Sequence, residues 1–234
     1  IVGEVSKALD DMGVADNTIL IFTSDNGGMM NHGGQDAWRA GHRLNGELLG
    51  FKFGIWEGGH RIPMIARWPG KIPAGTTSDQ LISQVDLMAT FAAATGYKLS
   101  PTEGLDSFNM LPALTGSPKE PIRDHLALIS SQRRAVSIRK GNWIYIPVKG
   151  GGGWGGKPGS HLCGGPAAHL LTKQKNSDIE NGKVKKDAPP AQLYDLQSDL
   201  GQTTNLYHKH PEIVKEMTAF LKATRTAKRT APQP

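Results

Sequence analysis

The spacing of apolar residues in the first half of the chain predicts alternating helices and strands. Residues 1–13 place an apolar side chain every three or four positions, which predicts an amphipathic helix. The short apolar run at 19–22, with its β-branched neighbours, instead predicts a buried strand of a parallel sheet. A second strand is predicted at 62–68 and a second helix at 83–95. This order is typical of an α/β fold, a mostly parallel sheet flanked by helices.

The pattern changes after about residue 122. Apolar and polar residues alternate at 135–140 and 143–147, and the intervening Gly-Asn predicts a hairpin. A third strand is predicted at 193–196, followed by a helix that begins at Pro211. These elements predict a small antiparallel sheet with one helix packed on it.

Two stretches show no sustained periodicity. Residues 29–50 predict a long loop, and such loops are often functional. Residues 149–191 are rich in Gly, Lys and Pro and predict an exposed, mobile excursion. We therefore expect two domains: residues 1–122 as part of an α/β domain, and 123–234 as a carboxyl-terminal α+β subdomain carrying the excursion.

Composition narrows the class of protein. The chain has 234 residues, 38% of them hydrophobic, and no apolar run long enough for a membrane helix. Its formal net charge of +6 favours anionic partners. The basic clusters at 183–186 and 225–229 lack an aromatic platform, which argues against nucleic-acid binding. The single cysteine, Cys163, excludes an intrachain disulfide.

The first predicted strand ends in Ser-Asp-Asn-Gly-Gly, and this is the first candidate site. Ligands of open α/β sheets bind beyond the carboxyl ends of the strands, where Asp25 and Asn26 would lie. Two adjacent oxygen donors suggest Ca²⁺ or Mg²⁺. Alternatively, the pair forms an Asx-turn that simply closes the strand.

Further motifs follow in order. Lys52 stands four residues before a Trp-Glu-Gly-Gly run, which leads into Arg-Ile-Pro and Arg-Trp-Pro-Gly. Other matches lie at 83–91, 134–143 and 192–206. Together these motifs resemble the carboxyl-terminal half of the sulfatase family, the formylglycine-dependent, arylsulfatase-like enzymes of the alkaline-phosphatase superfamily. The resemblance covers nearly the whole chain and implies an alkaline-phosphatase-like fold that is only partly present.

The resemblance also implies roles for individual residues. It implies that Asp25 and Asn26 bind Ca²⁺, with Mg²⁺ conceivable, and that Lys52 contacts the sulfate and acts in catalysis. Asn26 matters because related metallophosphatases have a histidine there, which suits Zn²⁺. His32 and His42 are weaker candidates for substrate binding. The residues expected to shape the site are Gly27, Trp56, Glu57, Gly58, Gly59 and Arg61. Asp86 is expected to start a helix, not to bind a ligand.

The sequence lacks the family's Cys/Ser-x-Pro-x-Arg motif, whose first residue becomes the formylglycine nucleophile. Cys163 has no Pro or Arg at the required offsets. We therefore expect a fragment that is inactive alone, from a parent protein that hydrolyses sulfate esters of small molecules or polysaccharides. The alternatives are a non-catalytic polyanion-binding remnant, or a phosphatase or phosphodiesterase relative. The family suggests an extracytoplasmic or lysosome-like compartment, whereas the ester and the oligomeric state stay open.

Overall fold

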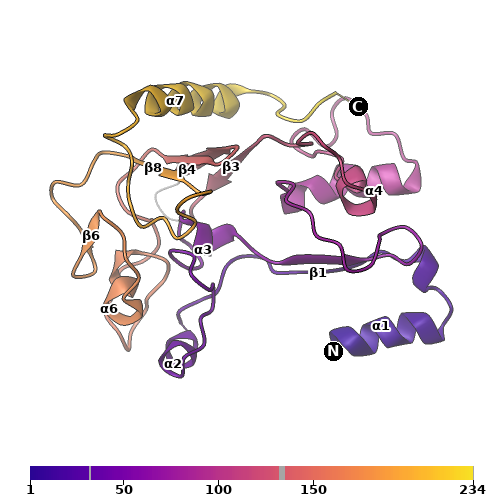
Figure 1. The fold of residues 1–234 in the computed structure, drawn as a ribbon, viewed down its shortest axis with the longest axis horizontal. Coiled ribbons are helices and arrows are strands. Elements are labelled where there is room, and N and C mark those ends of the chain that lie inside the picture. Colours follow the sequence, from indigo (N-terminus) through magenta and orange to yellow (C-terminus); the bar gives the residue numbers. More distant parts are fainter. Residues whose placement is uncertain (32, 132–134, 234) are drawn as a thin grey trace. The chain divides into compact units, whose positions relative to one another are not determined.

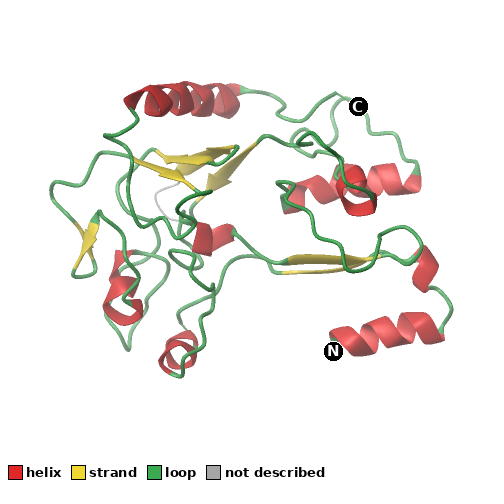
Figure 2. Ribbon diagram, viewed as in Figure 1, coloured by secondary structure: helices red, strands yellow, loops and turns green. Residues whose placement is uncertain are grey.

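The computed structural model describes residues 1–31, 33–131 and 135–233, and it has the mixed helix and strand content of an α/β protein (Figures 1 and 2). Arg134 and the other residues outside these ranges are not described. The α/β fold class is confirmed. None of the described helices combines the length and apolar character that a bilayer crossing requires.

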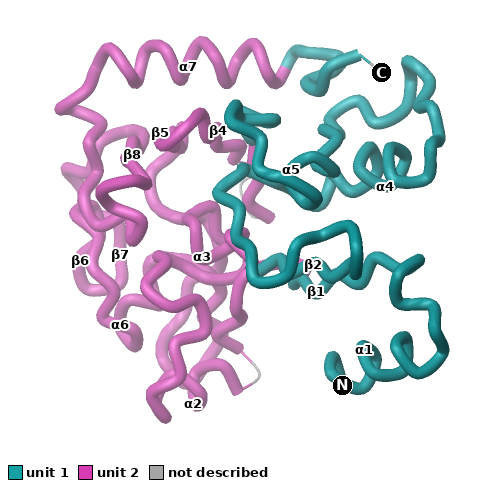
Figure 3. The backbone as a smooth tube through the Cα atoms, turned by 45° about the vertical axis from the view of Figure 1, so that its right-hand side comes forward, with its two compact units in different colours: residues 1–24, 63–126, 226–234 teal, residues 25–62, 127–225 magenta. Residues whose placement is uncertain are grey.

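The chain divides into two compact units, each built from separate segments of sequence (Figure 3). The first unit comprises residues 1–24, 63–126 and 226–234, and the second comprises 25–62 and 127–225. Neither unit is continuous along the chain. The expected division into domains at residue 122 stays a prediction.

Short elements make up the first unit. Helix α1 runs from Val2 to Asp11, and Gly13 follows in a left-handed conformation with φ +68°. Because glycine adopts this conformation readily, it ends the helix where the sequence predicts. The remaining elements are the 3₁₀ turns η1 Ala15–Asn17 and η2 Gln84–Asp86, strands β1 Leu20–Thr23 and β2 Met64–Arg67, and helices α4 Leu87–Thr95 and α5 Leu111–Thr115.

Strands β1 and β2 pair antiparallel, with Leu20 opposite Arg67 and Thr23 opposite Met64. The expectation of a buried parallel strand at this position is therefore wrong in both direction and burial. Phe22 is 45% exposed and Ile65 is 63% exposed. An apolar run indicates that a strand has apolar faces, but the direction of its partner depends on the path of the intervening chain, which hydrophobicity does not encode.

A buried ion pair organises the packing of the first unit. Ser83 and Asp86 form a capping box at the start of η2, and Asp86 then accepts hydrogen bonds from Arg123 at 2.6 and 3.1 Å. Both side chains are almost fully buried, at 0% and 3% exposure. The Phe108 N–H also donates to the Asp86 carboxylate at 2.9 Å. Asp86 is thus a helix-start residue with a structural role, as expected.

The second unit holds most of a four-stranded sheet in the order β3-β4-β5-β8. The strands are β3 His125–Ile129, β4 Val136–Lys140, β5 Trp143–Ile146 and β8 Gln192–Asp195. Strands β4, β5 and β8 are antiparallel neighbours. Helix α7 Pro211–Thr226 covers them with Met217 and Leu221, which pack with Ile138 and Leu193 (Figure 1). The predicted antiparallel sheet and its helix are therefore present.

The segment predicted as an exposed excursion instead contributes to the core. Leu162 and Ala168 are buried and pack with Phe51 and Met30. The prediction for 149–191 is wrong at these positions because a glycine-rich backbone can be buried by close packing without supplying large side chains. The segment contains η3 Pro166–Ala168, α6 His169–Thr172 and the short strands β6 Ile179–Glu180 and β7 Lys183–Val184.

Replacing Asp86 with Asn should lower the free energy of unfolding by about 3–5 kcal/mol, because the Arg123 guanidinium would keep its burial but lose its counter-charge. Urea unfolding followed by circular dichroism measures this change. Asp79→Asn is the matched control, since Asp79 is exposed. A loss below about 1 kcal/mol for Asp86→Asn would contradict the proposed importance of the pair.

Candidate functional site

The turn after β1 packs its backbone directly against a second backbone segment. The Gly27 N–H donates to the Gly59 carbonyl at 3.0 Å. A Cβ at Gly27 would lie only 1.8 Å from the Gly58 carbonyl oxygen, so no other residue type fits without displacing that segment. The tightness of this contact explains why glycines follow Asp25 and Asn26 in the sequence.

Asn45 joins three backbone segments around this contact. Its Oδ1 accepts the Gly28 N–H at 2.6 Å. Its Nδ2 donates to the carbonyls of Gly50 at 2.9 Å and Gly58 at 2.8 Å. Sequence reasoning missed this residue because a single Asn in a Gly-rich, non-periodic loop gives no signal of such a role.

Lys52 is anchored beside Asp25 by the same arrangement. Its N–H donates to the Gly28 carbonyl at 2.9 Å, and its Nζ lies 4.0 Å from the Asp25 carboxylate. The Lys52 side chain is 30% exposed and that of Asp25 is 80% exposed. The next residue, Phe53, has a φ of +77°, an uncommon conformation for a non-glycine residue. This turn keeps the ammonium close to the Phe53 ring, 5.4 Å from its centroid.

Trp56 ties the site to the sheet of the second unit. Its side chain is fully buried, and its Nε1 donates to the Gln192 Oε1 at 2.9 Å. The Tyr194 hydroxyl donates to the same oxygen at 2.7 Å, and burial raises the pKa of Tyr194 so that it stays protonated and able to donate. A Cβ at Gly151 would lie 2.3 Å from the Trp56 ring. The indole is therefore a packing anchor for the site.

Helix α3, Glu57–His60, carries the rest of the motif. Arg61 Nη1 donates to Glu57 Oε2 at 3.0 Å, while the Glu57 N–H donates to Gln202 Oε1 at 2.7 Å. The other oxygen of this buried carboxylate, Oε1, has no hydrogen-bond partner among the described residues. His60 Nε2 lies 3.0 Å from the Ile55 carbonyl, to which it donates. Glu57 thus joins Arg61 and Gln202, and the role of Glu57 and Arg61 in shaping the site stays a prediction.

Cys163 is an acceptor in the structure. Asn31 Nδ2 donates to its sulfur at 2.9 Å. Burial raises the pKa of the thiol, and the Asn31 hydrogen bond and the charge of Lys52 oppose that rise only in part. A thiol that stays protonated is a weak nucleophile, so Cys163 is poorly suited to attack a sulfate ester.

Of the two histidines predicted to bind substrate, the structure describes only His42. His32 lies outside the described residues. His42 is exposed, and its N–H closes the end of α2 Gly34–Arg39 by donating to the Ala37 carbonyl at 2.9 Å. In the described part of the chain, no hydrogen bond joins its side chain to Lys52 or Asp25. The role of both histidines in substrate binding stays a prediction.

The metal prediction fits the donor chemistry of the turn. Asp25 presents an exposed carboxylate, and Asn26 orients its amide by donating from Nδ2 to the Gly27 carbonyl at 2.9 Å. Hard oxygen donors of this kind suit Ca²⁺ or Mg²⁺, which need about six or more ligands. No group of three or more His, Cys, Asp or Glu side chains gathers for a metal within the described ranges. Asp25 and Asn26 therefore fit part of a coordination shell.

Gly58→Ala should destabilise the protein by about 1–3 kcal/mol, because the new Cβ would lie 2.2 Å from the Gly50 carbonyl oxygen. The urea unfolding midpoint measures the change. Gly155→Ala adds the same methyl where nothing lies within 4 Å and serves as the control. Equal midpoints for the two variants would show that the backbone contact is not restrictive.

His60 should contribute to the acid sensitivity of folding. Burial lowers the pKa of His60, and the nearby Glu57 raises it only in part. The unfolded chain therefore binds the proton more readily, so stability is full above the ordinary pKa of about 6.5 and falls as the pH drops toward the folded value. His60→Gln should flatten the stability profile between about pH 7 and 5.

The profile is measured by urea unfolding at each pH, with the exposed His208→Gln as control. An unchanged acid slope in His60→Gln would contradict this contribution.

Comparison with known proteins identifies the family of these motifs. A family model described as Sulfatase matches residues 1–97. An N-acetylgalactosamine-6-O-sulfatase of Bacteroides thetaiotaomicron is 34% identical over 230 residues, 96% of this chain and 40% of the relative. Human arylsulfatase A is 33% identical over 212 residues, 88% of this chain and 36% of the relative.

Solved structures agree with the sequence comparison. A Bacteroides thetaiotaomicron structure from work on the metabolism of multiple glycosaminoglycans has a TM-score of 0.73 at 30% identity. The match covers 96% of this chain and 42% of that one. The chain thus spans about 40% of the length of the relatives it matches. With its motifs in the expected order and its fold shared over nearly all of its length, the chain belongs to the sulfatase family.

Proposed function

We propose that the protein to which this chain belongs hydrolyses sulfate esters. The observation that carries the proposal is the placement of Lys52 Nζ 4.0 Å from the Asp25 carboxylate, in a turn that glycines and Asn45 hold. The Lys52 ammonium lies beside the oxygen donors proposed to hold a metal. An anionic ester could bind to both the ammonium group and the metal. Membership of the sulfatase family supports the same reaction class.

In this proposal Lys52 binds the sulfate group and stabilises the negative charge that develops as the S–O bond breaks. A compact ammonium on a flexible stem can follow that charge, and the partial burial of the Lys52 side chain strengthens the interaction over its value in water. The backbone hydrogen bond from Lys52 to Gly28 fixes the base of the side chain. The ammonium is thereby held near the ester before the reaction begins.

Asp25 and Asn26 would hold Ca²⁺, or alternatively Mg²⁺, through their carboxylate and amide oxygens. The bound cation would supply Lewis-acid polarisation of the sulfate oxygens. The Asp25 carboxylate would then have a second positive partner besides Lys52. The amide of Asn26 limits the negative charge of the pair, which favours a hard divalent cation over Zn²⁺.

The nucleophile proposed for the whole protein is the family's formylglycine. Cys163 does not replace it, because the thiol is buried and its pKa is raised. The family resemblance further suggests an extracytoplasmic or lysosome-like compartment. These parts of the proposal rest on family membership.

Lys52→Ala should lower kcat/KM for 4-nitrophenyl sulfate by about 100-fold or more in the intact protein, because one charge-stabilising donor is lost. Lys52→Arg should restore little of this, since a guanidinium has a different shape. Lys71→Ala, an exposed lysine outside the site, is the control. Steady-state kinetics on the sulfate and on 4-nitrophenyl phosphate separate the candidate activities. A loss below tenfold, or faster turnover of the phosphate, would contradict the proposal.

A further inference from the structure

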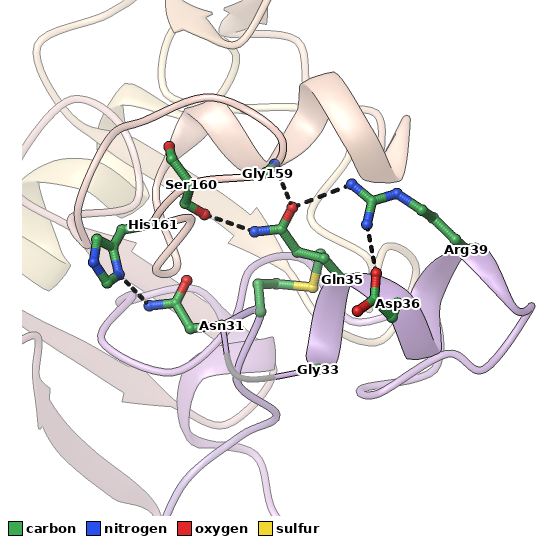
Figure 4. Close-up of a pocket in the computed structure, with 9 residues that line it drawn as sticks. Asn31, Gly33, Gln35, Asp36, Arg39, Gly159, Ser160 and His161 are labelled. Atoms are coloured by element: carbon green, nitrogen blue, oxygen red, sulfur yellow. Dashed lines mark hydrogen bonds and ion pairs between the residues drawn. The ribbon is translucent and has the colours of Figure 1, made fainter.

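A surface pocket of about 420 Å³, lined mainly by polar residues, lies in the second unit, between the start of α2 and the loop that precedes Cys163 (Figure 4). Its volume is typical of small-molecule sites, which span roughly 300–1,000 Å³. Asn31, Gln35, Asp36 and Arg39 line one side, and Ser160 and His161 line the other. Met30 contributes the apolar side chain. The reaction proposed above leaves this pocket without a role.

Hydrogen bonds hold the two walls of the pocket together. Gln35 Nε2 donates to the Ser160 carbonyl at 2.7 Å, and Gln35 Oε1 accepts the Gly159 N–H at 2.9 Å. Figure 4 shows this amide spanning the gap between helix and loop. Gln35 itself is only 9% exposed. The pocket is therefore shaped before any ligand binds.

The tautomer of the neutral His161 ring follows from its neighbours. The Leu162 N–H donates to Asn31 Oδ1 at 3.0 Å, and a backbone N–H can only donate, so this contact identifies the amide oxygen. Asn31 Nδ2 must then donate to His161 Nδ1, at 3.0 Å. The neutral ring consequently carries its proton on Nε2. Among the described residues, none accepts a hydrogen bond from that N–H, which leaves it as a donor for a ligand.

The charges of the pocket compensate one another. Arg39 Nη1 lies 2.8 Å from the Asp36 carboxylate, so the lining has donors and acceptors without a net charge. An apolar ring such as a steroid would desolvate these groups without offering them partners. A sugar ring satisfies them, because each hydroxyl both donates and accepts.

Asn31 also connects the pocket to the segment that carries Cys163. Its Nδ2 lies 2.9 Å from the Cys163 sulfur, and the charge of Lys52 acts on that thiol. The backbone that follows Cys163 also packs on Lys52, since a Cβ at Gly164 would lie 2.6 Å from the Lys52 carbonyl oxygen. This arrangement suits a substrate whose anionic end lies at Lys52 and whose alcohol lies against Asn31 and His161.

We propose that this pocket binds the sugar ring of a sulfated carbohydrate, with His161 Nε2–H donating to a ring substituent. The inference deepens the proposed function and rests on it only for the position of the sulfate. It assigns sulfate esters of carbohydrates as the substrate class, as opposed to simple aryl or steroid esters. His161 is a specificity residue in this account, because it contacts the alcohol and not the reacting sulfur.

The test compares two substrates in the intact protein. His161→Ala should lower kcat/KM for N-acetylgalactosamine 6-sulfate by about tenfold or more, while kcat/KM for 4-nitrophenyl sulfate stays within about twofold. His208→Ala, an exposed histidine outside the pocket, is the matched control. Saturation-transfer NMR with unsulfated N-acetylgalactosamine gives a second readout that needs no hydrolysis. The signal should disappear in His161→Ala.

The outcomes separate the two proposals. Lys52-dependent turnover of both esters with no selective effect of His161→Ala would overturn the pocket assignment and leave the reaction standing. Saccharide binding that depends on His161, without hydrolysis of either ester, would overturn the reaction and support the pocket. An equal loss on both substrates would show that His161 affects folding or chemistry, and it would also overturn its assignment to sugar recognition.

Discussion

The close contact between two glycine-containing backbone segments is the constraint on which the site depends. A Cβ at Gly27 or Gly58 would lie within about 2 Å of a carbonyl oxygen of the opposite or neighbouring segment, at 1.8 and 2.2 Å. Because these glycines have no side chains, the two segments come close enough for Asn45 to hydrogen-bond both the Gly28 N–H and the Gly58 carbonyl. Buried backbone groups left unpaired would be costly, so the packing and the hydrogen bonds require each other. The position of Lys52 follows from this arrangement.

The surrounding core of the second unit holds that local contact in place. Trp56 is bound to Gln192 on β8, and Tyr194 completes the same network. These side chains link the loop that carries Lys52 to the strands beneath it. Because catalysis of the proposed kind depends on donors held in place before the ester arrives, the functional loop benefits from being attached to a sheet.

The features that sequence could predict are those encoded locally or by a motif. Helical spacing predicted α1 and α7, the Gly-Asn turn predicted the β4–β5 hairpin, and motif order predicted the family. The direction of the β1–β2 pair was not predictable, since it depends on where the chain returns. Burial of Leu162 was missed because its partner Phe51 is distant in sequence. Asn45 and His161 were missed for the same reason: their roles arise from contacts between loops.

Amide hydrogen exchange at Gly27, Gly28 and Lys52 tests the central claim most directly. All three N–H groups donate to buried or half-buried acceptors across the glycine contact, at 3.0, 2.6 and 2.9 Å. The account predicts that they exchange slowly in the wild-type protein and together become fast in Asn45→Ala, while amides of the β4–β5 hairpin keep their protection. Fast exchange at these glycines in the wild type, or unchanged protection in Asn45→Ala, would contradict it.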